Sequence, residues 1–217
     1  MQAEFIYVIA KIWQVLASNS RWMSWNLFLA FVPLALSVWL FRKKRQRSPL
    51  WWLGLIVFFA FLPNAPYVLT DVIHLYQDIR TINSAWIITL VVLPVYLLFI
   101  LGGFAAYVLS LINLGHYLNL VNCSKWIIWV ELIIHFLCAV GIYLGRFLRF
   151  NSWDLITQPN IVVTSVVEDV VGKLPLVIIT ITFIVVAGLY WIMKQVSLGI
   201  LLPRNQNNHT QQQITNS

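Results

Sequence analysis

The sequence predicts an all-α membrane protein, a polytopic bundle of about five transmembrane helices. Of its 217 residues, 60 % are hydrophobic and only 10 % are charged, whereas soluble domains are nearer half apolar and a quarter charged. Several apolar stretches approach the roughly 20 residues that a helix needs to cross a bilayer. Eleven Trp and eight Tyr match the aromatic side chains that gather at the two membrane interfaces.

The first predicted span, Trp25–Phe41, ends at a run of cations. Five of the six residues from Arg42 to Arg47 are Arg or Lys, and basic loops beside a helix end stay in the cytoplasm. This run also explains the net charge of +7. The lipid bilayer is therefore the expected partner, and nucleic acid is not.

The remaining spans follow by alternation across the membrane. They are predicted at Leu50–Leu62, Trp86–Leu111, Trp126–Arg146 and Leu174–Met193. The long third stretch is expected to tilt or to extend past the bilayer. With five spans, the C-terminus lies in the cytoplasm with the Arg42–Arg47 loop.

The spans define a transmembrane domain over residues 24–194, flanked by two further regions. Residues 1–23 are predicted to form an interfacial helix, because the apolar stretch Phe5–Ala17 is short for a span. If this stretch does span, there are six helices and the basic loop stays inside. Residues 203–217 form a polar tail that is expected to be disordered, and Ile161–Val171 is an amphipathic stretch expected at the outer interface.

The second span is predicted to be broken at Pro63–Pro66. Leu50–Leu62 covers about 20 Å, which is short of the roughly 30 Å hydrocarbon core, before two prolines interrupt it. Asn64 is the predicted N-cap of a restarted helix, with Pro66 in its first turn. Irregular backbone at this depth is tolerated only inside protein or beside a water-filled cavity.

Polar residues recur at helical spacing after the break. Tyr67, Asp71, His74 and Asp78 are separated by four, three and four residues, so they share one helical face. One interpretation is an interfacial helix whose polar face meets water. The other, which the preceding break favours, is a polar site that opens to the outside.

The fourth span carries a second polar face. Glu131 and His135 lie within the membrane on the face that also carries Arg146 and Arg149. Ionisable groups in a bilayer are costly, face the bundle interior and are candidates for function. The alternative is a Glu–His pair that only holds helices together.

Arg146 and Arg149 emerge at the outer end, at the level of Asp71 and His74, and Asn151 and Asp154 follow. Opposite charges at one depth form either a structural ion pair or a site for an anion such as phosphate, which arginine grips bidentately. In an enzyme, Asp71 or His74 would be the general base. The arginines argue against a metal ion, and no motif identifies a cofactor.

Two segments resemble a known family. Phe61–Leu75 (FLPNAPYVLTDVIHL) and Gly145–Asp154 (GRFLRFNSWD) are similar to the recurrent segments of the membrane-protein family catalogued as domain of unknown function 1361. The resemblance implies a multi-helix protein of the bacterial inner (cell) membrane, with the family region between Trp25 and Met193. It implies no activity and no catalytic residues.

Three functions remain open. The first is an envelope enzyme or lipid-modifying factor that uses the outer cluster on an anionic lipid or another anionic envelope substrate. The second is a transport component, with Glu131, His135 and the broken helix along a path. The third is a structural or assembly protein whose charges only form ion pairs; protein partners are unknown in every case.

The charge run predicts the topology. A reporter that is active only in the periplasm should be inactive when fused after Arg47 and active when fused after Asp78. Enzyme activity of the two fusions, normalised to their abundance, measures this. The opposite pair of results would contradict every placement above.

Overall fold

The computed structural model describes residues 2–42, 47–82, 84–149, 157, 160 and 173–201. Helices are the only regular structure among them, which confirms the all-α class. Five stretches are long and apolar enough to cross a membrane: Asn19–Phe41, Pro49–Thr81, Ala85–Leu120, Ser124–Arg146 and Leu174–Gly199. The chain is therefore an integral membrane protein with the predicted bundle architecture.

The first helix, α1, runs from Gln2 to Phe41 without interruption and contains Pro33. The N-terminal stretch is thus not a separate element, because it continues directly into the first span. The part that is apolar enough to cross a membrane begins at Asn19. That residues 1–23 lie along an interface stays a prediction.

The second stretch is divided into four pieces. They are α2 (Pro49–Phe61), α3 (Asn64–Tyr67), a 3₁₀ turn (Val68–Asp71) and α4 (Val72–Thr81). Pro49 occupies the first turn of α2, and the Ser48 side chain accepts a hydrogen bond from the Trp51 N–H. A cap of this kind satisfies one of the free donors at a helix start.

The break lies at Leu62 and Pro63, and the prediction that Asn64 caps the restarted helix is wrong. Pro63 holds the cap position with helical dihedrals, and Asn64 Nδ2 instead donates to the Phe61 carbonyl at 3.0 Å. The Tyr67 N–H donates to the Pro63 carbonyl at 3.1 Å. The chain therefore passes both prolines in a helical conformation rather than as an unwound segment.

The third stretch begins with α5 (Ala85–Ile87), continues through a π-helical segment (Ile88–Val92) and becomes α6 (Leu93–Leu120). It ends at Leu120 rather than at the predicted Leu111. At 1.5 Å per residue, α6 alone is about 42 Å long. A helix of this length exceeds the roughly 30 Å hydrocarbon core and must tilt or project beyond it.

The fourth stretch agrees with the predicted span, and the fifth begins as predicted but ends at Leu201 rather than at Met193. The fourth is α7 (Ile127–Arg146), which follows a 3₁₀ turn at Ser124–Trp126, and the fifth is α10 (Lys173–Leu201). The predicted amphipathic stretch Ile161–Val171 and the polar tail 203–217 lie outside the described residues.

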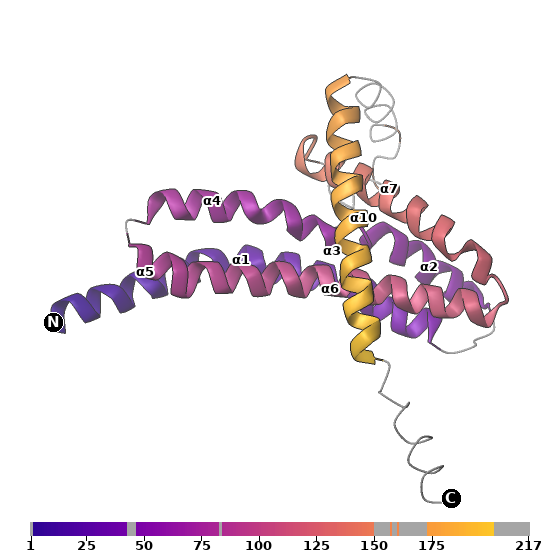
Figure 1. The fold of residues 1–217 in the computed structure, drawn as a ribbon, viewed down its shortest axis with the longest axis horizontal. Helices are drawn as coiled ribbons and strands as arrows, with labels where there is room; N and C mark the ends of the chain where they lie inside the picture. The colour runs from indigo at the N-terminus through magenta and orange to yellow at the C-terminus, as the bar shows by residue number, and fades with distance from the viewer. Residues whose placement is uncertain are drawn as a thin grey trace, which may run out of the picture.

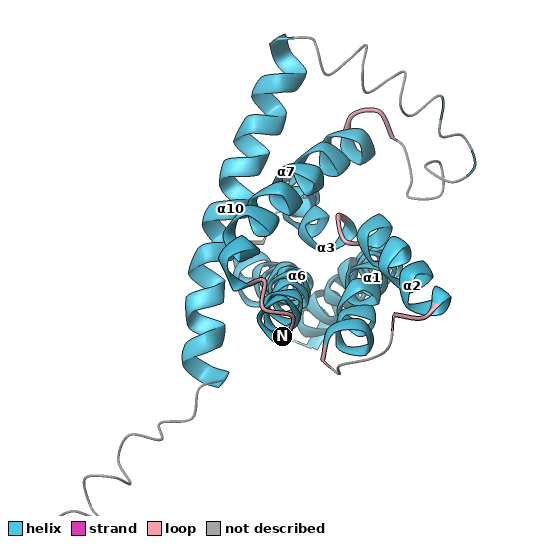
Figure 2. Cartoon of the chain, turned by 90° about the vertical axis from the view of Figure 1, so that its right-hand side faces the viewer, coloured by secondary structure: helices cyan, strands magenta, loops and turns pink. Residues whose placement is uncertain are grey.

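The helices form one elongated group crossed by α10. α1, the α2–α4 stretch and α6 run along the long axis of the molecule (Figure 1) and are grouped when seen along that axis (Figure 2). α7 is inclined to this group, and α10 crosses it steeply and packs mainly on α7. We call the end with Arg42 and Arg47 the Arg42 end, and the end with the turn between α4 and α5 the Thr81 end.

Two glycines allow α6 and α7 to approach the broken helix closely. A Cβ atom at Gly103 of α6 would lie 2.8 Å from both Val68 methyl groups. A Cβ atom at Gly141 of α7 would lie 2.9 Å from Cβ of Pro63. Small residues at helix contacts let helices approach within a membrane, and here they hold the break between two neighbours.

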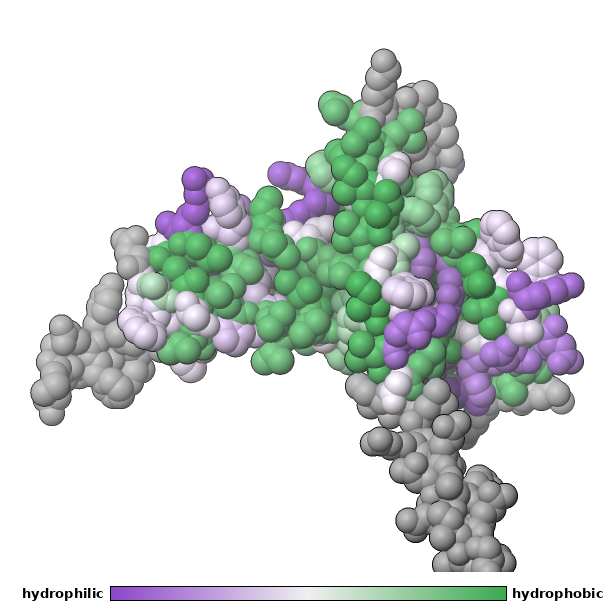
Figure 3. Space-filling model, viewed as in Figure 1, coloured by the Kyte–Doolittle hydropathy of each residue, from purple (hydrophilic) through white to green (hydrophobic). Residues whose placement is uncertain are grey.

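Much of the molecular surface is apolar (Figure 3). Trp86, Leu98 and Ile128 are each more than two-thirds exposed. Such extensive apolar surface is unusual on a monomeric soluble protein, and lipid chains cover it in a bilayer. Inside the bundle, Phe58, Tyr96 and Tyr107 are almost fully buried.

The two adjacent glycines of α6 provide a test of this packing. Gly103→Ala should lower the free energy of unfolding by about 1–3 kcal/mol, the usual cost of overpacking, because Val68 is buried and its β-branched side chain has little rotamer freedom. Gly102→Ala is the control, since its Cβ would lie 3.8 Å from Leu27, an ordinary contact. Thermal unfolding in detergent measures both.

Adding Val68→Ala to Gly103→Ala should recover part of the loss. If Gly103→Ala and Gly102→Ala unfolded at the same temperature, the described contact between Gly103 and Val68 would be contradicted.

Candidate functional site

Asp71 is the centre of a polar cluster toward the Thr81 end. It is the last residue of the 3₁₀ turn and its side chain is only 1 % exposed. Asn26 of α1 donates from Nδ2 to Oδ2 of Asp71 at 3.0 Å, and Oδ1 lies 3.6 Å from Nη1 of Arg146. A buried carboxylate is very costly unless it is paired, so these two partners hold three helices at one point.

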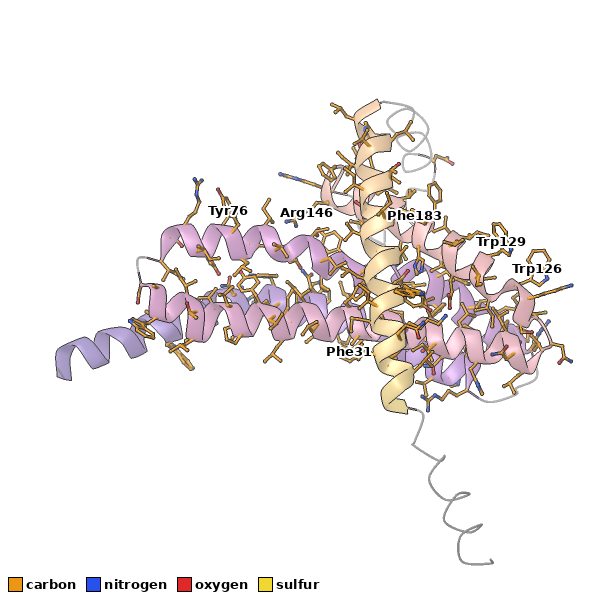
Figure 4. The ribbon with its side chains drawn as sticks, viewed as in Figure 1. Phe31, Tyr76, Trp126, Trp129, Arg146 and Phe183 are labelled. Atoms are coloured by element: carbon orange, nitrogen blue, oxygen red, sulfur yellow. The ribbon has the colours of Figure 1, made fainter. Side chains whose placement is uncertain are left out.

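Arg146, the last residue of α7, lies against the 3₁₀ turn and the residue before it. Its Nη2 donates to the Thr70 carbonyl at 3.2 Å, and its Nη1 lies 3.5 Å from the Tyr67 hydroxyl. The guanidinium also lies 5.9 Å from the centre of the Tyr67 ring. Figure 4 shows Arg146 beside the end of α4, where 23 % of its side chain is exposed.

This geometry does not favour the predicted role of Asp71 as a general base. Its carboxylate is buried and already accepts Asn26 on one oxygen while facing Arg146 with the other. A general base must reach the proton of a substrate within hydrogen-bond distance. Asp71 instead fixes the position of Arg146.

His74 and Asp78 continue the polar face along α4. The His74 ring lies 4.8 Å from the Trp22 ring, and its Nδ1 is 3.3 Å from Oε1 of Gln77. Asp78 Oδ2 accepts hydrogen bonds from Asn19 Nδ2 at 2.6 Å and from the Tyr96 hydroxyl at 3.0 Å. His74 is partly exposed, so it is the more accessible of the two predicted base candidates.

The α1 contribution to this cluster was missed from the sequence. Asn19, Trp22 and Asn26 are separated by three and four residues and contact Asp78, His74 and Asp71 in that order. Their helical spacing was available as a signal. The prediction divides these residues between an interfacial helix (1–23) and the first span (Trp25–Phe41), so the face that they share in α1 was overlooked.

Arg149 does not join the cluster through any contact between described residues. It lies beyond the end of α7, is exposed, and has a left-handed backbone with φ of 58°. Helical spacing therefore does not place it on the face of Arg146. Asn151 and Asp154 lie outside the described residues, and Asn64 contacts the Phe61 carbonyl at the break instead.

Glu131 belongs to a second network toward the Arg42 end. Its Oε1 accepts hydrogen bonds from the Tyr190 hydroxyl and from Lys194 Nζ, both at 2.6 Å. Both donors are on α10, so this charged contact joins α10 to α7. Tyr190 and Lys194 were missed from the sequence, although their spacing of four residues puts them on one face of the last span.

His135 forms the other half of this network. It is 2 % exposed, and its Nδ1 lies 2.6 Å from the Tyr107 hydroxyl of α6. Its ring also contacts the Tyr190 ring, at 4.6 Å between centroids. Glu131 thus binds α10, His135 contacts both α6 and α10, and the network connects α6, α7 and α10.

In the part of the chain that the structure describes, no three His, Cys, Asp or Glu side chains are grouped so that they could hold a metal ion. Asp71 is in contact with Asn26 and Arg146, and His74 with Gln77 and Trp22. The absence of a metal from the site stays a prediction.

The comparisons with known proteins identify the family. A model of the family described as "Protein of unknown function (DUF1361)" matches residues 25–187. The chain belongs to this family. No curated protein and no solved structure matches the chain.

The DUF1361 region contains the whole Asp71–Arg146 contact, including Asn26, Tyr67 and Thr70. It also contains Glu131 and His135, but it ends before Tyr190 and Lys194. The family description carries no activity, so any function must be argued from the two polar networks.

Proposed function

We propose that this DUF1361 protein lies in the inner membrane of a bacterium and binds an anionic envelope or lipid-linked group at its outer face. In this proposal, Arg146 and Arg149 hold the anion, and the Asp71–Arg146 cluster is the binding site. The observation that carries it is a partly exposed arginine fixed in place by a buried carboxylate.

The orientation rests on the distribution of charge. Arg42, Arg47 and Lys125 lie at the Arg42 end, in the loops before α2 and before α7. The tendency of basic loops to stay in the cytoplasm puts this end inside and the Thr81 end outside. A cytoplasmic C-terminus follows from the odd number of predicted spans and is part of the proposal.

The capacity to bind an anion comes from the donors of Arg146. A guanidinium carries five N–H donors in a planar fork, more than its contacts with Tyr67, Thr70 and Asp71 use. Charge-assisted bonds from such a fork to phosphate or carboxylate are strong and directional. Arg149, exposed three residues later, adds a second cation.

Asp71 and His74 have separate roles in this proposal. Asp71 and Asn26 position the guanidinium, so an incoming anion meets an arginine whose geometry is already set. His74 is the partly exposed group that could exchange a proton if the bound group is also processed.

A second candidate, a transport component, is favoured by the Glu131–Lys194 pair inside the membrane span. Intramembrane charges often line substrate or ion paths. A variant in which Glu131 and Lys194 are both neutralised tests this candidate, with Arg146 left unchanged. Loss of the protein's cellular function without loss of its abundance would favour a transport role. In the third candidate, a structural or assembly protein, both polar networks only hold helices together.

Phosphate binding by purified protein tests the proposal. Inorganic phosphate should raise the thermal stability of the wild type in detergent, because a ligand that binds only the folded state stabilises it. Arg146→Lys keeps the charge but loses the fork, and Arg149→Gln loses the charge. Each should weaken the apparent affinity about tenfold or more, as expected for a lost charge-assisted bond.

Arg80→Gln is the matched control. Arg80 is exposed on α4 and lies 5.0 Å from the Tyr76 ring, away from Asp71. It should respond to phosphate as the wild type does. A wild type that does not respond, or equal affinities in all four proteins, would contradict the proposed function.

A further inference from the structure

The depth of the Asp71–Arg146 cluster is set by helix length. From Pro49, the start of α2, to Asp71 the chain rises about 33 Å along its helices. From the start of α7 to Arg146 the chain covers 20 residues, or about 30 Å. Both routes begin at the Arg42 end, whereas along α1, from Phe41 to Asn26, the helix covers about 22 Å. Between about 22 and 33 Å of helix thus separates the cluster from the Arg42 end, which puts it in the outer part of a roughly 30 Å hydrocarbon core, toward the opposite headgroup boundary.

Apolar surface flanks the cluster on both sides. At the position of Arg146 labelled in Figure 4, the surface in Figure 3 is hydrophilic and lies between apolar surface over α4 and over α10. Ile73, one helical turn beyond Thr70, is 48 % exposed, and Phe147, next to Arg146, is 54 % exposed. A soluble anion would need no such surroundings.

We infer that the anion held by Arg146 and Arg149 is the phosphate of a membrane lipid, which enters the cluster sideways from the bilayer with its chains against the neighbouring apolar side chains. This inference rests on the proposed function and narrows it to one class of ligand. Three features support it: the two arginines, a depth toward the outer headgroup boundary that helix length gives, and the exposed apolar side chains of Ile73 and Phe147.

The chemistry of a lipid phosphate fits each part of this surface. Its phosphate oxygens accept hydrogen bonds from the guanidinium of Arg146, and its headgroup lies toward the same membrane boundary as the cluster. Its acyl chains extend into the hydrocarbon. There they contact the exposed side chains of Ile73 and Phe147, which are apolar and lose no hydrogen bond by the contact. The approach is lateral because α4 and α1 occupy the space directly outward of Asp71, where Asn19, Trp22 and Asp78 are in contact.

Three probes on the full-length protein in detergent test the inference. They are dihexanoyl phosphatidic acid, inorganic phosphate and dihexanoyl phosphatidylcholine, each titrated while thermal unfolding is followed. The phosphatidic acid should bind at least about tenfold more tightly than phosphate, since burial of two methylene groups amounts to that factor. The zwitterionic lipid should bind more weakly than phosphatidic acid.

Polar substitutions beside the site distinguish the contribution of the acyl chains to affinity from that of the phosphate. The double change Ile73→Ser with Phe147→Ser should remove the advantage of phosphatidic acid and leave the affinity for phosphate unchanged. Ile128→Ser is the control, because Ile128 is 69 % exposed but lies near the start of α7, at the other end. It should retain the full advantage.

The possible outcomes are distinguishable. Equal affinities for phosphatidic acid and phosphate would overturn the lipid inference and leave the proposed function standing. No binding of either probe would overturn both. Equal affinities for the two lipids would overturn the inference by showing adsorption of chains without recognition of the phosphate.

Discussion

The ion pair between Asp71 and Arg146 is the contact on which the packing of the helices toward the Thr81 end depends. Asp71 is almost completely buried, and a carboxylate there is tolerated only because Arg146 and Asn26 face it. Those partners come from α7 and α1. One buried charge therefore fixes where three stretches of the chain meet, and the aromatic and amide contacts along α4 follow from that meeting point.

The broken helix carries this contact. Asp71 is the last residue of the 3₁₀ turn that follows the prolines at 63 and 66, and Gly103 and Gly141 let α6 and α7 close on the break. At the Arg42 end, the Glu131–Lys194 pair holds α10 to α7 in a similar manner. Among the described residues, an ion pair thus joins helices toward each end of the bundle.

Sequence periodicity predicted the polar faces but not their partners. The spacing of Tyr67, Asp71 and His74 located one half of the cluster, and helix length placed Arg146 at the same depth. Neighbour relations between helices are not encoded in the period of one helix, so Asn26, Tyr107 and Lys194 were missed. Arg149 was assigned to the face of Arg146, yet α7 ends at Arg146 and the backbone at 149 is left-handed, so helical spacing no longer applies.

A double-mutant cycle at Asp71 and Arg146 tests the central claim most directly. The variants Asp71→Asn, Arg146→Gln and their combination are compared with the wild type by thermal unfolding in detergent. We expect each single change to destabilise the fold and the double change to recover at least about 1 kcal/mol of the summed loss, within the range seen for contacting residues. Simple additivity of the two losses would contradict the claim that this pair holds the helices together.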